Sequence, residues 1–254
     1  KTAEDCALIL QYIAGLDPYD ATSSPLLVGD YTSHIQEGVK GKIIGLPKEF
    51  MSKGLDPEVK QLVLQAAKKF VDLGAKIEAV SLPTLEYGIS IYYLLAPSET
   101  SSNLARYDGI RYGNGRDKFT PETMRRIMIG TYALSAGYYD QYYKKAQQAR
   151  TLIIEDYEKV FTKCDMILSP VSPTPPTKLG ELINDPVKNM LADIYTLTTN
   201  TAGIPALALP CGFTETGLPV GMQLQGPMFS EKLLLQAGYA YQQATTWHHE
   251  KPTL

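Results

Sequence analysis

The stretch that decides the fold runs from residue 42 to residue 82 and reads KIIGLPKEFMSKGLDPEVKQLVLQAAKKFVDLGAKIEAVSL. Residues 42–46 form an apolar run that a proline ends, which is typical of a short buried strand. Asp56, followed by proline, is a good N-cap for a helix that Gly74 closes, and residues 76–82 alternate as a second strand. Strand, helix and strand with short links predict a parallel βαβ unit, and therefore an α/β protein.

The same signals, followed outward from this unit, predict the remaining elements. Residues 3–15 form an amphipathic helix behind the cap Thr2, and Ser230 caps a last helix that runs to about residue 246. Two apolar strands flank the turn at 212–217 and indicate a hairpin. The other expected elements are two or three helices within 87–113 and 121–163 (the last about 138–162), a helix at 186–199, and strands at 165–171, 205–210 and 219–225. No repeat or domain boundary is evident, so residues 1–254 are treated as one unit.

Composition excludes several classes of function. The chain has 254 residues, 44% of them hydrophobic and 20% charged, which is ordinary for a globular protein. A net charge of −3 argues against a broad nucleic-acid surface, because phosphate binding needs clustered Lys and Arg. Any RNA partner would be reached through another subunit or a local patch. No apolar run approaches the length needed to cross a bilayer, so we expect no membrane partner.

The three cysteines, Cys6, Cys164 and Cys211, lie far apart and form no CxxC pair. A zinc site or a disulfide scaffold is therefore not expected, and a reducing, cytoplasmic location is. The dinucleotide-binding GxGxxG, the HExxH metal motif and the GxSxG nucleophile motif are absent, and residues 38–42 resemble a phosphate loop only superficially. We interpret the histidines at positions 34, 248 and 249 as solvated surface residues, and expect no metal site.

A few polar residues in partly apolar surroundings remain as candidates for chemistry. The arginines at 125–126 follow Glu122 near a predicted helix start, where they form either a solvated face with that acid or a binding group. Asp193 lies among apolar residues, as a helix-surface acid or as a half-buried carboxylate that needs a partner. The tyrosines at 92–93 are typical of core aromatics with a polar neighbour for each hydroxyl. These patterns alone do not name a reaction.

Whole phrases of the sequence carry a resemblance. They are TAED (2–5), IAG (13–15), DP (17–18), IGLPKE (44–49), YYL (92–94), SSNLARYDGIRYG (101–113), RRIMIGT (125–131), SAGYYD (135–140), AGIPA (202–206) and LPVGMQL (218–224). Together they resemble the amidase-signature family, and within it the family of A (glutaminase) subunits of glutamyl-tRNA(Gln) amidotransferases. The phrases at 101–113 and 135–140 are specific to these subunits, whereas those at 202–206 and 218–224 belong to the wider family.

The resemblance implies an α/β fold with a mixed, mainly parallel sheet covered by helices. It also implies a triad of Lys, a Ser in a cis peptide and a nucleophilic Ser, which hydrolyses glutamine with backbone N–H groups at the oxyanion. The ammonia then passes to a partner subunit that activates glutamate on tRNA(Gln) with ATP and Mg. The implied partners are glutamine, the B and C subunits of a heterotrimer in protein biosynthesis, and tRNA indirectly through the B subunit; this chain itself needs no cofactor.

The sequence departs from the family pattern in two places. It contains no Gly/Ser-rich signature and starts at Lys1 without Met, so we expect an upstream segment with the Ser and Lys triad to be absent, no catalytic residue to be assignable, and the isolated chain to be inactive. The link at 114–119 is shorter than the family's usual insertion. Either the protein has a true deletion here, or residues have been left out of the sequence.

What carries over is the glutamine-binding side. The family's Arg for the substrate α-carboxylate matches Arg126, for which planar bidentate pairing is the physical reason. The family's Asp for the α-amino group matches Asp193, and its pocket tyrosine matches Tyr93 or, failing it, Tyr92. Two other functions stay open: another amidase-signature hydrolase acting on a different amide, and a non-catalytic fragment that docks to partner subunits.

Overall fold

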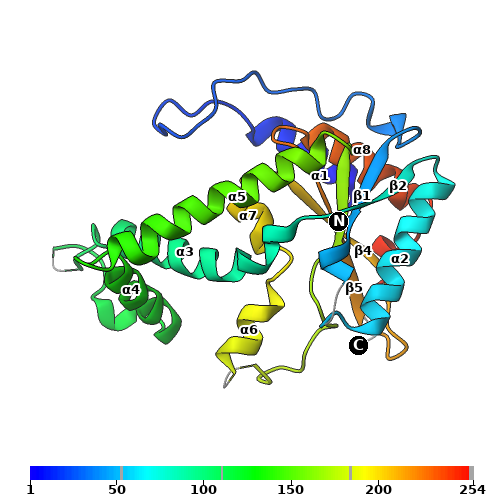
Figure 1. Ribbon diagram of the computed structural model, residues 1–254. Coiled ribbons are helices and arrows are strands. Elements are labelled where there is room, and N and C mark those ends of the chain that lie inside the picture. The colour runs from blue at the N-terminus through cyan, green and yellow to red at the C-terminus, as the bar shows by residue number, and fades with distance from the viewer. Residues whose placement is uncertain (52–53, 110, 183–184, 252–254) are drawn as a thin grey trace.

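The structure is a computed structural model that describes residues 1–51, 54–109, 111–182 and 185–251. Its strands form one five-stranded sheet in the order β2-β1-β3-β5-β4. Helices cover the sheet, and a group of helices (α3, α4 and the start of α5) extends away from it as an arm (Figure 1). The candidate site lies where this arm meets residues 186–202, which connect the third and fourth strands in chain order.

The predicted βαβ unit is present at one side of the sheet. It consists of β1 (Ile43–Pro47), α2 (Pro57–Asp72) and β2 (Lys76–Val80), and the two strands are parallel. The Asp56 carboxylate accepts hydrogen bonds from the first backbone N–H groups of α2, as a capping acid should. The helix is followed by Gly74 at φ +91°, a conformation that glycine adopts without strain.

The rest of the sheet mixes directions. Strand β3 (Met166–Pro170) pairs parallel with β1 and antiparallel with β5 (Pro219–Gln225). The predicted hairpin is confirmed, because β4 (Ala206–Phe213) pairs antiparallel with β5. The α/β class and the mixed sheet are therefore as expected, with β4 at one edge.

Three helices of the middle region make up the arm and its root. They are α3 (Gly88–Leu104), α4 (Pro121–Ala133) and α5 (Lys144–Phe161), which follows a π-helical turn at Tyr139–Tyr143. The prediction of a long last helix is confirmed apart from this wider turn at its start. Short 3-10 segments lie at Ile35–Glu37, Lys48–Met51, Pro83–Tyr87, Arg116–Lys118 and Trp247–His249.

The prediction of a single helix at 186–199 is wrong, because the structure has two helices there, α6 (Pro186–Ala192) and α7 (Leu197–Ala202). The break begins at Asp193, whose carbonyl accepts hydrogen bonds from the N–H groups of Thr196 and Leu197. Thr196 also donates its hydroxyl to that carbonyl. Threonines that bond to nearby carbonyls compete with regular helix hydrogen bonding, which favours a break here.

The first and last helices pack together beside the sheet. In α1 (Ala3–Ile13) the Thr2 cap is confirmed as a complete capping box. Ser230 does precede α8 (Glu231–Gln243), but its predicted capping bond is wrong. Its hydroxyl donates instead to the carbonyl of Pro227, 2.6 Å away, so it closes the turn that leads into the helix.

A buried polar network ties the root of the arm to the sheet. The Tyr157 hydroxyl of α5 lies 3.0 Å from the Gln225 side-chain oxygen of β5 and 3.2 Å from the Thr198 hydroxyl of α7. The Gln225 amide donates to Ser169 of β3 at 3.1 Å. Buried polar groups are tolerated when each has a partner, and this network fixes α5 and α7 relative to the central strands.

Candidate functional site

Close packing of α3 against α4 forms the first wall of the site. Helix α4 starts after Thr120, whose hydroxyl accepts a hydrogen bond from the Thr123 N–H at 3.2 Å. Gly130 of α4 is buried against α3, and a side chain there would overlap the carbonyl oxygen of Pro97. The glycine therefore lets the two helices approach closely, with Tyr93 on one and Arg126 on the other.

Arg126 is held by neighbours on both helices. Its Nε donates to Glu122 Oε1 at 2.8 Å, one turn earlier in α4, and its guanidinium carbon lies 5.8 Å from the centre of the Tyr93 ring. Arg125 meets the other oxygen of Glu122. The two arginines thus partner Glu122, as one of the two interpretations held, and Arg126 also contacts an aromatic ring. The hydrogen bond from Arg126 lowers the pKa of the Glu122 carboxyl.

Tyr93 connects the arginine to the third predicted residue. Burial raises the pKa of its hydroxyl, the negative charge of Asp193 raises it further, and the charge of Arg126 opposes both. Tyr92 packs edge-on against it with ring centres 5.2 Å apart. The hydrogen bond to Glu122 is the main cause that raises the pKa of the Arg126 guanidinium, and the nearby Tyr92 hydroxyl adds to it. Tyr93 therefore lies beside Arg126 and within electrostatic reach of Asp193.

Asp193 comes from outside the arm, at the break between α6 and α7. Its backbone ends one helix and starts the next, and its side chain is exposed, which matches the helix-surface alternative. Within the described ranges, no side chain donates a hydrogen bond to its carboxylate. Arg126, Tyr93 and Asp193 thus offer a cation, a phenol and an anion with free acceptor capacity, linked by the effect of both charges on the Tyr93 hydroxyl. This set complements the carboxylate and ammonium of an α-amino acid.

A small polar cavity of about 220 Å³ lies beside this cluster. Tyr92 lines it together with Glu99 of α3, Arg150 of α5 and Asn200 of α7, and Arg150 Nε donates to the Thr201 carbonyl at 2.8 Å. Sequence reasoning missed Glu99 and Arg150, because neither belongs to a motif and only the packing of three helices places them together.

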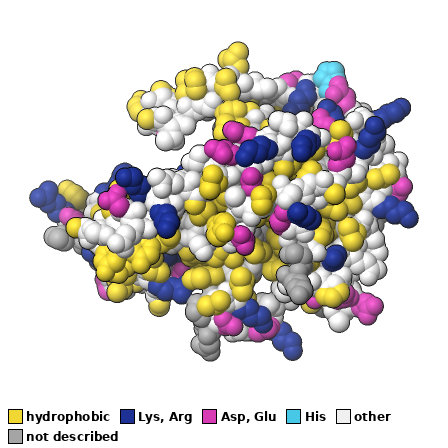
Figure 2. Space-filling view, viewed as in Figure 1, with side chains coloured by type: hydrophobic (Ala, Val, Ile, Leu, Met, Phe, Trp, Pro, Cys, Tyr) yellow, Lys and Arg dark blue, Asp and Glu magenta, His cyan; other side chains and the backbone are white. Residues whose placement is uncertain are grey.

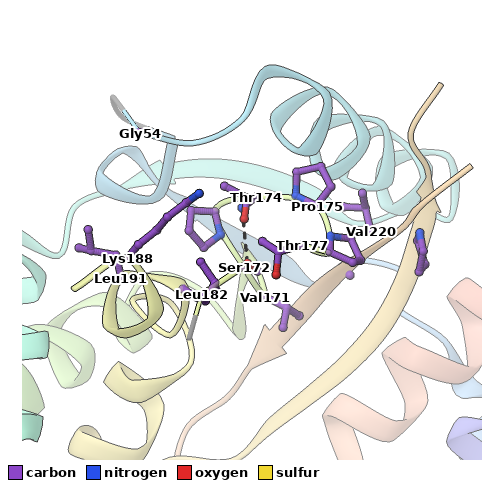
Figure 3. A pocket seen from close by; sticks show the side chains of 15 residues that line it. Gly54, Val171, Ser172, Thr174, Pro175, Thr177, Leu182, Lys188, Leu191 and Val220 are labelled. Carbon is purple, nitrogen blue, oxygen red and sulfur yellow. Dashed lines mark hydrogen bonds between the residues drawn. The ribbon is translucent and has the colours of Figure 1, made fainter. Parts of the chain in front are cut away.

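A larger crevice of about 420 Å³ opens where β3 ends. Figure 3 shows Lys188 and Leu191 of α6 on one side of it and Val220 of β5 on the other, with the proline-rich loop 171–177 between them. Crevices beyond the carboxyl ends of parallel strands are common ligand sites. Its lining is mostly apolar and includes none of the three predicted residues, although it reaches Ala192, the neighbour of Asp193.

Histidine and cysteine contribute little to this region. His34 pairs with Glu37 at the surface, 3.1 Å apart, as expected, but the surface interpretation of His248 is wrong because that residue is buried. Burial lowers the pKa of the His248 imidazole. In the part of the chain that the structure describes, no three His, Cys, Asp or Glu side chains are grouped to hold a metal ion. None of its described helices is both long and apolar enough to span a membrane.

Comparison with known sequences identifies relatives along the whole chain. The profile of the Amidase family matches residues 1–235. The A subunit of the glutamyl-tRNA(Gln) amidotransferase of Desulfatibacillum aliphaticivorans is 51% identical over 269 residues, which cover 100% of this chain and 56% of that protein. The corresponding A subunit of Moorella thermoacetica is 51% identical over 268 residues, covering 100% of this chain and 55% of the relative. The chain therefore spans about half the length of the curated relatives it matches.

Solved structures agree on the fold. The A subunit of the glutamyl-tRNA(Gln) amidotransferase from Thermotoga maritima superposes with a TM-score of 0.78 at 38% identity, covering 94% of this chain and 50% of that one. A bacterial aryl acylamidase of the amidase signature family gives a TM-score of 0.79 at 26% identity, covering 98% and 52%. A 6-aminohexanoate cyclic dimer hydrolase, 19% identical with a TM-score of 0.83 and covering 99% and 55%, shares the fold.

Proposed function

This chain belongs to the amidase family, and from that premise we propose that it is the glutamine-binding part of the glutaminase (A) subunit of a glutamyl-tRNA(Gln) amidotransferase. In this proposal the whole protein hydrolyses glutamine and supplies ammonia for the conversion of Glu-tRNA(Gln) to Gln-tRNA(Gln). The proposed setting is the cytoplasm, with the B and C subunits as partners and tRNA reached through the B subunit. ATP and Mg are used by the partner, and the Ser, cis-Ser and Lys triad lies in residues that this chain lacks.

The observation that carries the proposal is that Tyr93 lies beside Arg126 and within electrostatic reach of Asp193. The guanidinium of Arg126 offers paired N–H donors for an α-carboxylate, and Asp193 offers an acceptor for an α-ammonium group. The Tyr93 hydroxyl, with its raised pKa, stays protonated at neutral pH and is available as a donor. Held by its α-carboxylate and its α-ammonium group, glutamine would present its side-chain amide in one orientation to a nucleophile. Such orientation is how binding energy aids catalysis.

Two other functions are weighed against this one. A hydrolase of different amides would not need a cation and an anion placed for a free amino acid. A docking role has its own support, because Figure 2 shows hydrophobic side chains gathered over α4, where Met128 and Tyr132 are 68% and 53% exposed. Such a surface is compatible with a contact between subunits in either case. The charges of Arg126 and Asp193 are what support glutamine binding over a docking role alone.

The test compares ligands that lack one end of the zwitterion. L-Glutamine, glutaramate (no α-amino group) and 4-aminobutanamide (no α-carboxylate) are titrated into the 254-residue chain by calorimetry. We expect glutamine to bind best, with each missing charge weakening binding roughly 10- to 100-fold, the range for one charge-assisted contact. Arg126→Ala should abolish the preference over 4-aminobutanamide, and Asp193→Asn the preference over glutaramate.

Arg125→Ala is the matched control, since Arg125 shares the carboxylate of Glu122 but does not lie over Tyr93. It should leave the order of the three affinities unchanged. Equal affinity for all three ligands in the unaltered chain would contradict the proposed function and favour the docking interpretation.

A further inference from the structure

Glu122 binds the Nε of the Arg126 guanidinium, and in the described part of the chain no other hydrogen bond to this guanidinium is found. The two residues lie one turn apart on α4, and the Nε–Oε1 distance is 2.8 Å. A guanidinium has one N–H on Nε and four on its terminal nitrogens. With Nε bound to Glu122, the terminal nitrogens remain for a planar carboxylate that pairs with two of them.

We propose that Glu122 is a positioning residue that holds Arg126 in the orientation in which it receives the α-carboxylate of a bound amino acid. This inference rests on the proposed function, since it deepens the role of the same site. Glu122 touches neither the ligand nor the reacting atoms; it acts through Arg126.

The physical reason is the mobility of an unrestrained arginine. The Arg126 side chain is 31% exposed, and without a partner it would sample many rotamers. A ligand that must first immobilise such a side chain loses roughly three- to tenfold in affinity. Two contacts limit that loss here: the hydrogen bond to Glu122 and the Tyr93 ring beside the guanidinium carbon.

The charge of Glu122 could have the opposite effect. A carboxylate close to Arg126 competes with a ligand carboxylate for the same cation and repels it. The geometry favours positioning, because Glu122 binds the Nε edge and shares its second oxygen with Arg125, which draws its charge away from the open edge. The side chain is also 46% exposed, so solvent screens its repulsion of the ligand. Positioning and competition predict opposite signs for removal of Glu122.

The experiment measures the affinities of L-glutamine and 4-aminobutanamide for the 254-residue chain and its variants. Glu122→Ala should weaken glutamine binding roughly three- to tenfold. Binding of 4-aminobutanamide, which has no carboxylate, should not change. Glu122→Gln should restore most of the glutamine affinity, because its amide oxygen still accepts from Nε. In the Arg126→Ala background, Glu122→Ala should have no further effect.

The outcomes separate the inference from the function it rests on. Tighter glutamine binding in Glu122→Ala would show competition, and equally weaker binding of both ligands would show a structural role in α4. Either result would overturn the inference about Glu122 but not the proposed function. Unchanged affinity in Glu122→Ala with a loss in Arg126→Ala does the same. If Arg126→Ala itself leaves glutamine binding unchanged, the proposed function fails first. Glu4→Ala, at the first turn of α1, controls for the loss of a first-turn acid.

Discussion

Two opposite charges act on the hydroxyl of Tyr93. Burial is the main cause of its raised pKa, Asp193 adds to the effect, and Arg126 reduces it. A tyrosinate would be repelled by Asp193 and attracted by Arg126, so the ionisation of this one group reports on both neighbours. This makes the arrangement of the three side chains measurable without any ligand.

At this scale we expect Asp193→Asn to lower the pKa of Tyr93, because it removes a negative charge that opposes ionisation. Arg126→Ala should raise that pKa, because it removes the stabilising cation. Both shifts can be followed by NMR titration of tyrosine ring carbons. Tyr19, which is 97% exposed, serves as the reference signal. A Tyr93 signal that moves in neither variant would show that the three residues are not neighbours in solution.

The sequence indicated which side chains to examine, but it could not distinguish between adjacent residues such as Tyr92 and Tyr93. Consecutive helix residues point about 100° apart, so only the partner helix decides which of two faces a site. Packing of α3 on α4 places the Tyr93 ring over the Arg126 guanidinium, while Tyr92 lines the neighbouring cavity. Glu99 could not be predicted at all, because its cavity is formed by residues from three helices.

At the scale of elements, the contact between α3 and α4 depends on one glycine. Gly130 lies against the carbonyl of Pro97 and the hydroxyl of Ser101, which leaves no room for a β-carbon. Backbone is far less able to yield than the end of a long side chain. The position of α4, and of Arg126 with it, therefore depends on this close approach.

Gly130→Ala should destabilise the protein by about 1–3 kcal/mol, the usual cost of overpacking. In an uncrowded helix the same change would stabilise by about 0.8–1 kcal/mol, so the sign is diagnostic. Urea unfolding gives the free energy, and calorimetry should also show weaker glutamine binding. Thr131→Ala, at an exposed position of the same helix, should change stability little. A stabilised Gly130→Ala variant would disprove the tight contact.

Local signals predicted most elements, and failed where several weak preferences compete. The Asp56 and Thr2 caps and the β4–β5 hairpin were predictable because turn and cap chemistry acts over a few residues. The 186–199 segment was predicted as one helix because its apolar spacing gave no sign of a break. The break depends on threonine hydroxyls bonding back to carbonyls, as Thr196 does to Asp193.

For the whole molecule, strand order was beyond local reasoning. Sequence neighbours predicted the β1–β2 and β4–β5 pairs. The position of β3 between β1 and β5 depends on contacts between distant segments. One of them is the hydrogen bond from Tyr157 to Gln225, the β5 residue that pairs with Ile167 of β3. The resemblance to a known family provided the mixed sheet that patterns alone did not.

At the same scale we expect the 254-residue chain to release no ammonia from glutamine. Its sequence has no Gly/Ser-rich segment to provide a nucleophile, although it has the proposed binding residues. A coupled glutamate dehydrogenase assay measures the ammonia. Turnover that Arg126→Ala abolishes would refute the expectation. When the chain is joined to an upstream segment of a relative and becomes active, Arg126→Ala should mainly raise KM, because the contact exists before and during reaction.

The proposed clamp draws its parts from different pieces of the molecule: Arg126 and Tyr93 come from the helical arm, and Asp193 from the break between α6 and α7. An amino acid bound to all three residues would connect the arm to the break between α6 and α7, and this connection would be lost when the ligand leaves. Its binding would stiffen the arm by mass action.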